Sequence, residues 1–194
     1  MIDVLLLGNG AMLPLPDRWL SSLLIRMNGS LTLFDCGEGT QITARRFHWG
    51  FKRIDAILLS HMHADHVAGL PGLFLTVSNA GRTEPMHIYG PAGTIDVIKG
   101  LRVIAPWLRY DMVIHELADG DTFELPSGLN GTAVAGDHGM PVLAYRLDAQ
   151  PRAHGRGQLP DQEPAPALAS RRALVPRHPG RHRPGQQHAG LAMG

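Results

Sequence analysis

The stretch that most constrains the fold is "ILLSHMHADHVAGLPG", Ile57–Gly72, in which three histidines and an aspartate lie within six residues directly after an apolar run. In an extended segment, residues two apart point the same way, so His61 and His63 can converge on one metal ion. Asp65 and His66, where the chain turns into a helix, can face a second ion nearby. Metal binding would explain four such residues in so small a space beside a core strand.

A polar surface loop is the alternative interpretation of this cluster. It would be favoured for a lone histidine, but four residues of metal-binding type between a strand end and a helix start favour a metal site. Neutral imidazoles and carboxylates are the mixture that borderline divalent ions such as zinc accept. The sequence therefore predicts a metal centre over residues 61–66.

The first 150 residues have the pattern of one α/β domain. Helices are expected over residues 38–50, after the histidine cluster and over Gly93–Ile104, with Pro71 kinking or restarting the second of them. Asn28-Gly29 is the pair that a tight hairpin turn prefers. The expected strands are short, aliphatic and bounded by turn residues. They are Ile2–Leu7, Ser22–Met27, Ser30–Asp35, Ile54–Ser60, Met86–Tyr89, Met112–Glu116, Thr122–Leu125, Gly131–Ala135 and Val142–Leu147.

The last 44 residues, 151–194, differ in character. They contain 7 Pro, 6 Gly, 7 Arg and 4 His but no Ile, Phe, Tyr or Trp. A segment so poor in large apolar side chains cannot offset its ordering entropy by burial, so this tail is expected to be disordered. A basic RNA-binding arm is one interpretation of the tail. A non-native extension is the favoured one, and translation out of frame after Gln150 would produce such a composition.

Charge is divided unevenly between the body and the tail. Residues 1–150 carry 11 Lys+Arg against 15 Asp+Glu, a net charge of −4, whereas residues 151–194 carry 7 against 2, a net charge of +5. The body therefore lacks the basic surplus of a nucleic-acid binder. No apolar stretch approaches the roughly 18–20 residues of a membrane span, and the N-terminus has the pattern of a strand rather than a signal peptide. The single Cys36 cannot form an internal disulfide, which fits a cytoplasmic protein.

The motif "HMHADH" and its context resemble the metallo-β-lactamase superfamily, and within it the ribonuclease Z group of tRNA 3′-processing endonucleases. The resemblance includes "LLLGNGAMLPLPDRWLSS", "FDCGEGTQ" and "AGLPGL" and covers residues 1–148. In place of the family's Arg-Asn after the proline loop, this chain has Arg18-Trp19. The resemblance implies a metallo-β-lactamase-like αββα sandwich, of which residues 1–150 would form only the N-terminal part, truncated or frameshifted after about residue 150.

The resemblance also implies the remaining site residues. The segment "AVAGDHGMPVLAYRL" matches the strand end that carries the family's next ligand, so His138 would join His61 and His63 around a first Zn²⁺ ion. Three histidines leave an open position for water, whose pKa such an ion lowers towards about 7. Asp65 would act as the proton acceptor and, together with His66, would contact a second Zn²⁺ ion.

The intact family binds two ions, which share a bridging aspartate, and a last histidine completes the second site. Neither residue has a recognisable counterpart in this chain, so about one Zn²⁺ ion is expected. The four tail histidines lack strand context and are not assigned as ligands; they are His154, His178, His182 and His188.

Asp35 and the isolated residues have simpler interpretations. Asp35 is either a carboxylate that fixes a ligand histidine or a turn residue at a strand end. Cys36 is expected to pack in the core rather than to act as a nucleophile. The remaining body histidines are expected to be structural; they are His48, His87 and His115.

Three functions follow from these observations. The resemblance implies a zinc-dependent phosphodiester hydrolase that removes the 3′ trailer from tRNA precursors. The same fold could instead hydrolyse a small phosphodiester, a sulfate ester or a lactone, because fold does not fix function. The third interpretation is an inactive, truncated metal-binding fragment. Half of a two-sheet sandwich would leave a sheet face uncovered and favour self-association, for example as a homodimer.

Overall fold

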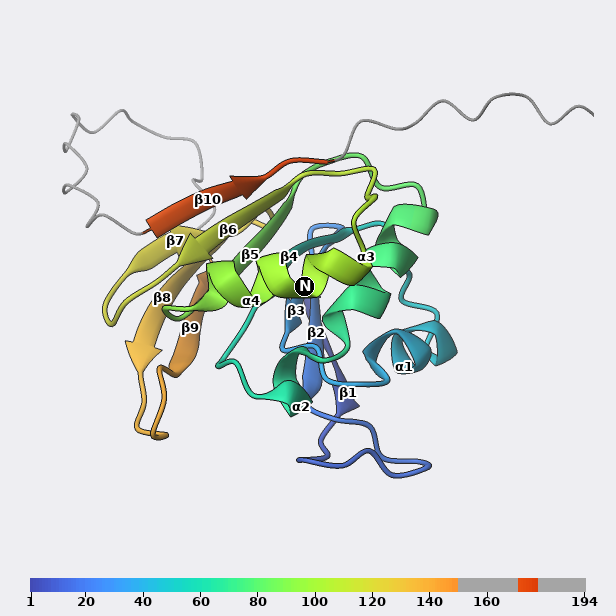
Figure 1. Ribbon diagram of the computed structural model, residues 1–194, viewed down its shortest axis with the longest axis horizontal. Helices are drawn as coiled ribbons and strands as arrows, with labels where there is room; N and C mark the ends of the chain where they lie inside the picture. Colours follow the sequence, from blue (N-terminus) through green and yellow to red (C-terminus); the bar gives the residue numbers. More distant parts are fainter. Residues whose placement is uncertain (150–170, 178–194) are drawn as a thin grey trace, which may run out of the picture.

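The aliphatic segments of the chain form two β-sheets in the computed structural model, which describes residues 1–149 and 171–177 (Figure 1). The larger sheet has the strand order β1-β2-β3-β4-β5-β6-β10, and the smaller has the order β7-β8-β9. All nine predicted strands form, with ends displaced by at most two residues. The strands are β1 (Ile2–Gly8), β2 (Ser22–Met27), β3 (Ser30–Phe34), β4 (Ile54–Leu58), β5 (Met86–Gly90), β6 (Met112–Glu116), β7 (Thr122–Glu124), β8 (Leu129–Ala135), β9 (Leu143–Ala149) and β10 (Arg171–Val175).

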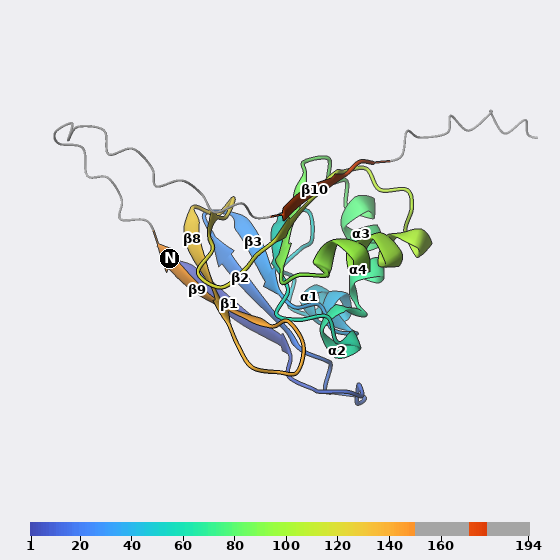
Figure 2. The same ribbon diagram turned by 60° about the vertical axis from the view of Figure 1, so that its left-hand side comes forward.

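Helices cover one face of the larger sheet, and the smaller sheet covers part of the other face (Figure 2). Over residues 1–149 and 171–177, no helix covers the outer face of the smaller sheet. None of the helices in these residues is long and apolar enough to cross a membrane. The arrangement is the helix–sheet–sheet part of an αββα sandwich. The helices are α1 (Thr40–Arg46), α2 (Ala64–Val67), α3 (Leu70–Asn79), α4 (Thr94–Leu101) and the short 3₁₀ helix η1 (Arg102–Ile104).

Two hydrophobic cores lie on the two faces of the larger sheet. Successive residues of a strand point to opposite faces, so Ile57 packs in the core under the helices and its neighbour Leu58 packs in the core between the sheets. Leu125 and Leu143 join Leu58 from the smaller sheet. The continuous apolar run of β4 is thereby buried on both faces.

Two local predictions on backbone geometry are confirmed. Pro71 begins a new helix rather than kinking an existing one, because it stands in the first turn of α3, where the missing N–H leaves no hydrogen bond unmade. Asn28 and Gly29 have φ angles of 52° and 77°, the left-handed pair that a two-residue hairpin turn requires.

The prediction that the whole tail is disordered is wrong for β10. Arg171–Val175 pairs antiparallel with β6, with Val175 opposite Met112 and Arg171 opposite Glu116. Without β10, the outer edge of β6 would present unpaired backbone groups, and main-chain pairing needs no large side chains. The composition of the tail therefore gave no sign of this strand. The prediction for residues 150–170 and 178–194 lies outside the described part of the chain.

The larger sheet extends beyond the smaller sheet at its β1 edge. Ile2, Val4 and Leu6 lie on the face that points towards the smaller sheet, because Ile2 pairs with Met27, which packs against the core between the sheets. These three side chains are nevertheless 48%, 59% and 55% exposed. This is the uncovered apolar face that half of a two-sheet sandwich is expected to have.

Candidate metal centre

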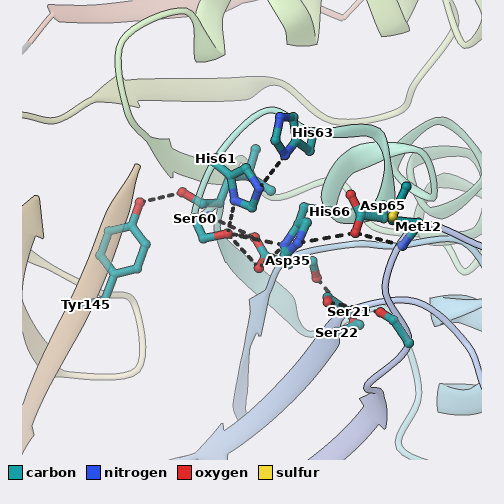
Figure 3. A network of polar contacts seen from close by, with 12 residues as sticks. Met12, Ser21, Ser22, Asp35, Ser60, His61, His63, Asp65, His66 and Tyr145 are labelled. Atoms are coloured by element: carbon teal, nitrogen blue, oxygen red, sulfur yellow. Dashed lines mark hydrogen bonds and ion pairs between the residues drawn. The ribbon is translucent and has the colours of Figure 1, made fainter. Parts of the chain in front are cut away.

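The candidate site lies where β3 and β4 end side by side. These strands are parallel, so their carboxyl ends meet at the same edge of the sheet, with Asp35 following β3 and Ser60 following β4. His61 and His63 continue from Ser60, and α2 then carries Asp65 and His66. Figure 3 shows these side chains pointing towards one another.

His138 reaches the same site from the smaller sheet, where it lies in the loop between β8 and β9. Two hydrogen bonds hold the start of β9 to the end of β4: Leu143 N–H donates to the Ser60 carbonyl at 2.9 Å, and the Tyr145 hydroxyl donates to the Leu59 carbonyl at 2.7 Å. The docking of the two sheets therefore fixes the position of His138.

The imidazoles of His61, His63 and His138 form a compact cluster. One nitrogen from each lies within 4.8 Å of the others, and His61 Nε2 is 3.1 Å from His63 Nδ1. Tetrahedral ligands around zinc, at bond lengths of about 2.0–2.1 Å, stand about 3.3 Å apart. The cluster therefore fits a zinc ion in its donor atoms and spacing. His61 is buried, whereas His63 and His138 are exposed, so the cluster opens to solvent.

Asp65 and His66 form an adjoining pair rather than part of the cluster. Asp65 Oδ2 lies 3.7 Å from His66 Nε2 and accepts a hydrogen bond of 3.1 Å from the Met12 backbone N–H. The ring centroid of His66 is 4.1 Å from that of His61. Within the described residues, these two side chains are the candidates for holding a second ion.

Asp35 is both a turn residue at a strand end and a carboxylate that contacts a candidate ligand histidine. Its φ angle is 52°, as in a turn residue, and its carboxylate Oδ2 lies 2.7 Å from His66 Nδ1. Ser60 also contacts this carboxylate through its backbone N–H and its hydroxyl group. The sequence did not single out Ser60 or the Met12 N–H, because their roles depend on contacts between distant segments. The position of Ser60, directly before the first histidine, was the one available signal.

The surroundings shift the pKa values of three of these groups. Burial, and then the neighbouring imidazoles of His66 and His63, lowers the pKa of His61. The hydrogen bond to Asp35 raises the pKa of His66, although burial opposes it. The hydrogen bond from the Met12 N–H lowers the pKa of Asp65. At neutral pH, His61 is therefore a neutral imidazole and Asp65 an ionised carboxylate.

Glycines allow the turn after β3 to dock on the segment between α2 and α3. A Cβ atom at Gly37 would come within 2.5 Å of the Asp65 carbonyl oxygen, and one at Gly69 within 2.3 Å of the Gly37 carbonyl oxygen. Cys36 N–H donates to the His66 carbonyl at 2.7 Å between them. Cys36 is fully buried, and burial raises its pKa to about 12, which supports the interpretation that it packs in the core.

The predicted ligands thus divide into two groups. The structure brings together His61, His63 and His138, and it places Asp65 and His66 beside them. His87 and His115 lie elsewhere in the larger sheet, with His87 Nδ1 at 3.2 Å from His115 Nε2. Their ring centroids are 5.5 Å apart in nearly parallel planes, so the two nitrogens face each other as in a hydrogen bond.

Comparison with known proteins identifies the family. Residues 32–155 match a family model described as a beta-lactamase superfamily domain. Ribonuclease Z from Clostridium kluyveri is 46% identical over 151 residues, which cover 77% of this chain and 50% of that protein. Ribonuclease Z from Lachnospira eligens is 51% identical over 147 residues, which cover 76% of this chain and 48% of that protein. The chain therefore spans about half the length of the curated relatives it matches.

Solved structures have the same fold. The crystal structure of human tRNase Z, short form, superposes with a TM-score of 0.66 and 30% identity, over 78% of this chain and 66% of that chain. A diphosphatase of the PhnP family has the same fold at a TM-score of 0.60 and 24% identity. The chain therefore belongs to the beta-lactamase superfamily, and its body is homologous to part of ribonuclease Z.

Proposed function

We propose that this chain carries the metal-binding part of a zinc-dependent phosphodiester hydrolase of the ribonuclease Z type, which removes the 3′ trailer from tRNA precursors in the cytoplasm. The observation that supports it best is the cluster of His61, His63 and His138 beside Asp65 and His66, in a chain 46% identical to a ribonuclease Z. A hydrolase that attacks phosphodiesters needs such a set of nitrogen and carboxylate donors at an open surface.

The three histidines of the cluster and the adjoining pair would have different roles. His61, His63 and His138 would hold the first zinc ion, and Asp65 and His66 would contribute to a second. When bound, zinc supplies Lewis-acid chemistry, which stabilises charge on a phosphate and makes water a stronger nucleophile at neutral pH. Asp65 would accept the proton of the attacking water, since its carboxylate is held ionised by the Met12 N–H.

The loop before β2 bears on how this chain would select its substrate. Arg18 donates hydrogen bonds to the side chain and the carbonyl of Asn9, at 3.1 and 3.0 Å, which hold its guanidinium group on the loop. Trp19 packs against Gly39, because a Cβ atom added to this glycine would lie 2.1 Å from the indole ring and only a residue without a side chain leaves room for it. Because Trp19 replaces the family's asparagine, we expect this chain to contact the tRNA end differently from its relatives.

Two ligands hold a second ion weakly, so we expect the 194-residue chain to bind about one zinc ion and to have little nuclease activity. Elemental analysis of purified protein, together with cleavage of a tRNA precursor, tests this. His61→Ala should abolish zinc binding, and His48→Asn, at an exposed histidine outside the cluster, should not. Absence of zinc in the unmutated chain would contradict the metal centre. Two tightly bound ions, or cleavage as fast as that of a full-length relative, would contradict the incomplete second site.

The charge of the body favours a second candidate, a hydrolase of small phosphodiesters. Residues 1–150 carry a net charge of −4, which does not attract a polyanion such as tRNA. Hydrolysis of bis(p-nitrophenyl) phosphate without cleavage of a tRNA precursor would favour this candidate over the first.

A further inference from the structure

We propose that Ser60 is a positioning residue whose hydroxyl group links Asp35 to His61, so that one carboxylate orients a histidine at each of the two metal positions. Asp35 contacts His66 directly and reaches His61 through Ser60 (Figure 3). Because Ser60 acts through His61, this role rests on the metal centre proposed above. It extends that proposal by connecting the two metal positions through a shared partner.

The distances around Ser60 are those of a connected network. Its backbone N–H donates to Asp35 Oδ1 at 2.8 Å, and its Oγ lies 3.0 Å from Oδ1 and 2.8 Å from Oδ2 of the same carboxylate. Ser60 Oγ also lies 2.9 Å from His61 Nδ1 and 3.3 Å from His66 Nδ1. Ser60 therefore stands between the carboxylate and both imidazoles.

Counting protons assigns the direction of each hydrogen bond. An ionised carboxylate only accepts, and a hydroxyl group has one proton to donate, so Ser60 donates to Asp35 and accepts from His61 Nδ1–H. His66 Nδ1–H donates to Asp35 Oδ2 at 2.7 Å. In their neutral forms, both imidazoles are thereby held with the proton on Nδ1 and the lone pair on Nε2.

The free Nε2 atoms point to the two metal positions. His61 Nε2 is the atom 3.1 Å from His63 Nδ1 in the three-histidine cluster. His66 Nε2 is the atom 3.7 Å from Asp65 Oδ2 in the adjoining pair. The tautomer that Asp35 and Ser60 favour is therefore the one that can bind a metal ion at each position.

Asp35 is a fixed anchor for this network. Its backbone N–H donates to the Leu58 carbonyl at 2.9 Å, and its own carbonyl accepts a hydrogen bond of 3.2 Å from the Ser22 hydroxyl. The carboxylate is thus held between β3 and β4. Ser22 touches the backbone of Asp35 and not its carboxylate, which makes it a matched control for Ser60.

The first experiment measures zinc affinity by competition with a chromophoric chelator. Ser60→Ala should weaken binding by about 10–100-fold, the usual effect of removing the partner that orients a ligand histidine. Ser60→Thr keeps the hydroxyl group and should restore the affinity. Ser22→Ala should bind zinc like the unmutated chain. Equal affinity of Ser60→Ala and Ser22→Ala would overturn the proposal.

The second experiment reads the tautomer directly, by ¹⁵N NMR of histidine-labelled, metal-free protein. His61 in the unmutated chain should carry its proton on Nδ1, and Ser60→Ala should shift it towards the Nε2–H form. A His61 that carries its proton on Nε2 in the unmutated chain would overturn the proposal, whether or not the variant folds. If the unmutated chain binds no zinc, the metal centre fails, while the tautomer still tests the link through Ser60.

Discussion

Gly37 and Gly69 are the residues at which two backbone segments of the site touch. A side chain at either position would meet a carbonyl oxygen at 2.5 Å or less. Gly69 N–H also donates to the Cys36 carbonyl at 2.9 Å, so the contact is a hydrogen-bonded one. These two glycines set the distance between Asp35, at the end of β3, and the helix that carries Asp65 and His66.

Gly69→Ala should therefore lower both stability and zinc affinity. The added methyl group must push α2 and α3 away from the turn after β3, and such overpacking typically lowers the free energy of unfolding by about 1–3 kcal/mol. Gly100→Ala is the control, since a Cβ atom there meets no other atom within 4 Å and alanine favours the helix by about 0.5–1 kcal/mol. Urea denaturation and chelator competition measure the two effects. Similar stability of the two variants would contradict this prediction.

The sequence indicated the candidate ligands of residues 61–66 more readily than the residues that position them. His61, His63, Asp65 and His66 are close in the chain, so local geometry alone brings them near one another. The contact between Ser60 and Asp35 depends on the parallel register of β3 and β4, in which Phe34 pairs with Leu58. No local pattern encodes that register, so the link could be found only in the folded structure.

At the scale of single elements, β5 and β6 carry a pair of histidines across their shared border. His115 stacks on Tyr89 at 4.4 Å, and Tyr89 stacks on Phe123 of the smaller sheet at 4.6 Å. Burial, and then the neighbouring His87, lowers the pKa of His115 to about 4. The pair therefore supports the packing of the two sheets in its neutral form.

This pair should make the fold sensitive to mild acid. Between about pH 6.5, where an unfolded histidine takes up a proton, and about pH 4, where folded His115 does so, the unfolded chain binds more protons. Stability should therefore fall as the pH falls through this range. Thermal melts of His115→Gln should show a flatter dependence on pH than melts of the unmutated chain, and those of His48→Asn should not. An unchanged slope in His115→Gln would contradict the assignment.

Secondary-structure elements were predicted well where apolar side chains mark them in the sequence. They were predicted poorly where backbone hydrogen bonding determines them. Short runs rich in apolar or β-branched residues, bounded by turn residues, located β1 to β9, and the central strands of the larger sheet are also the most buried ones. β10 has an apolar run of only three residues, within a tail rich in Arg, Pro and Gly, and it pairs with the edge of β6. The end of the helix predicted over Gly93–Ile104 also differed, since its last three residues form a 3₁₀ turn. Helix ends depend on local hydrogen bonding that the apolar pattern does not fix.

At the scale of the whole molecule, the two sheets overlap only in part. The smaller sheet covers the middle of the larger one and leaves Ile2, Val4 and Leu6 of β1 exposed. The chain spans about half the length of its ribonuclease Z relatives. An apolar face of this kind favours association with another apolar surface.

The isolated chain should therefore self-associate through β1. Val4→Lys places a charge in the centre of the exposed face and should shift sedimentation-velocity profiles towards the monomer. Leu174→Lys is the control, because Leu174 is 63% exposed on β10, at the opposite edge of the same sheet. Unmutated protein that stays monomeric at high concentration, or equal effects of the two substitutions, would contradict the role of β1.

Zinc should stabilise the folded chain. An ion that binds the native state alone adds a free energy of RT ln(1 + [Zn²⁺]/Kd), which is about 2.7 kcal/mol at 100 times Kd. Calorimetry should show a higher melting temperature with zinc than with a chelator, and His138→Ala should remove most of the difference. A melting temperature that does not respond to zinc would contradict binding to the folded state.

The origin of His138 gives such an ion a second consequence. His61 and His63 follow a strand of the larger sheet, whereas His138 lies between two strands of the smaller one. A single ion held by all three would cross-link segments that are 75 residues apart in the sequence, as a removable counterpart of a disulfide bridge. Such an ion would add a link to two layers that an apolar core and two hydrogen bonds already hold together, so the same three nitrogen atoms would serve both the chemistry of the site and the mechanical cohesion of the sandwich.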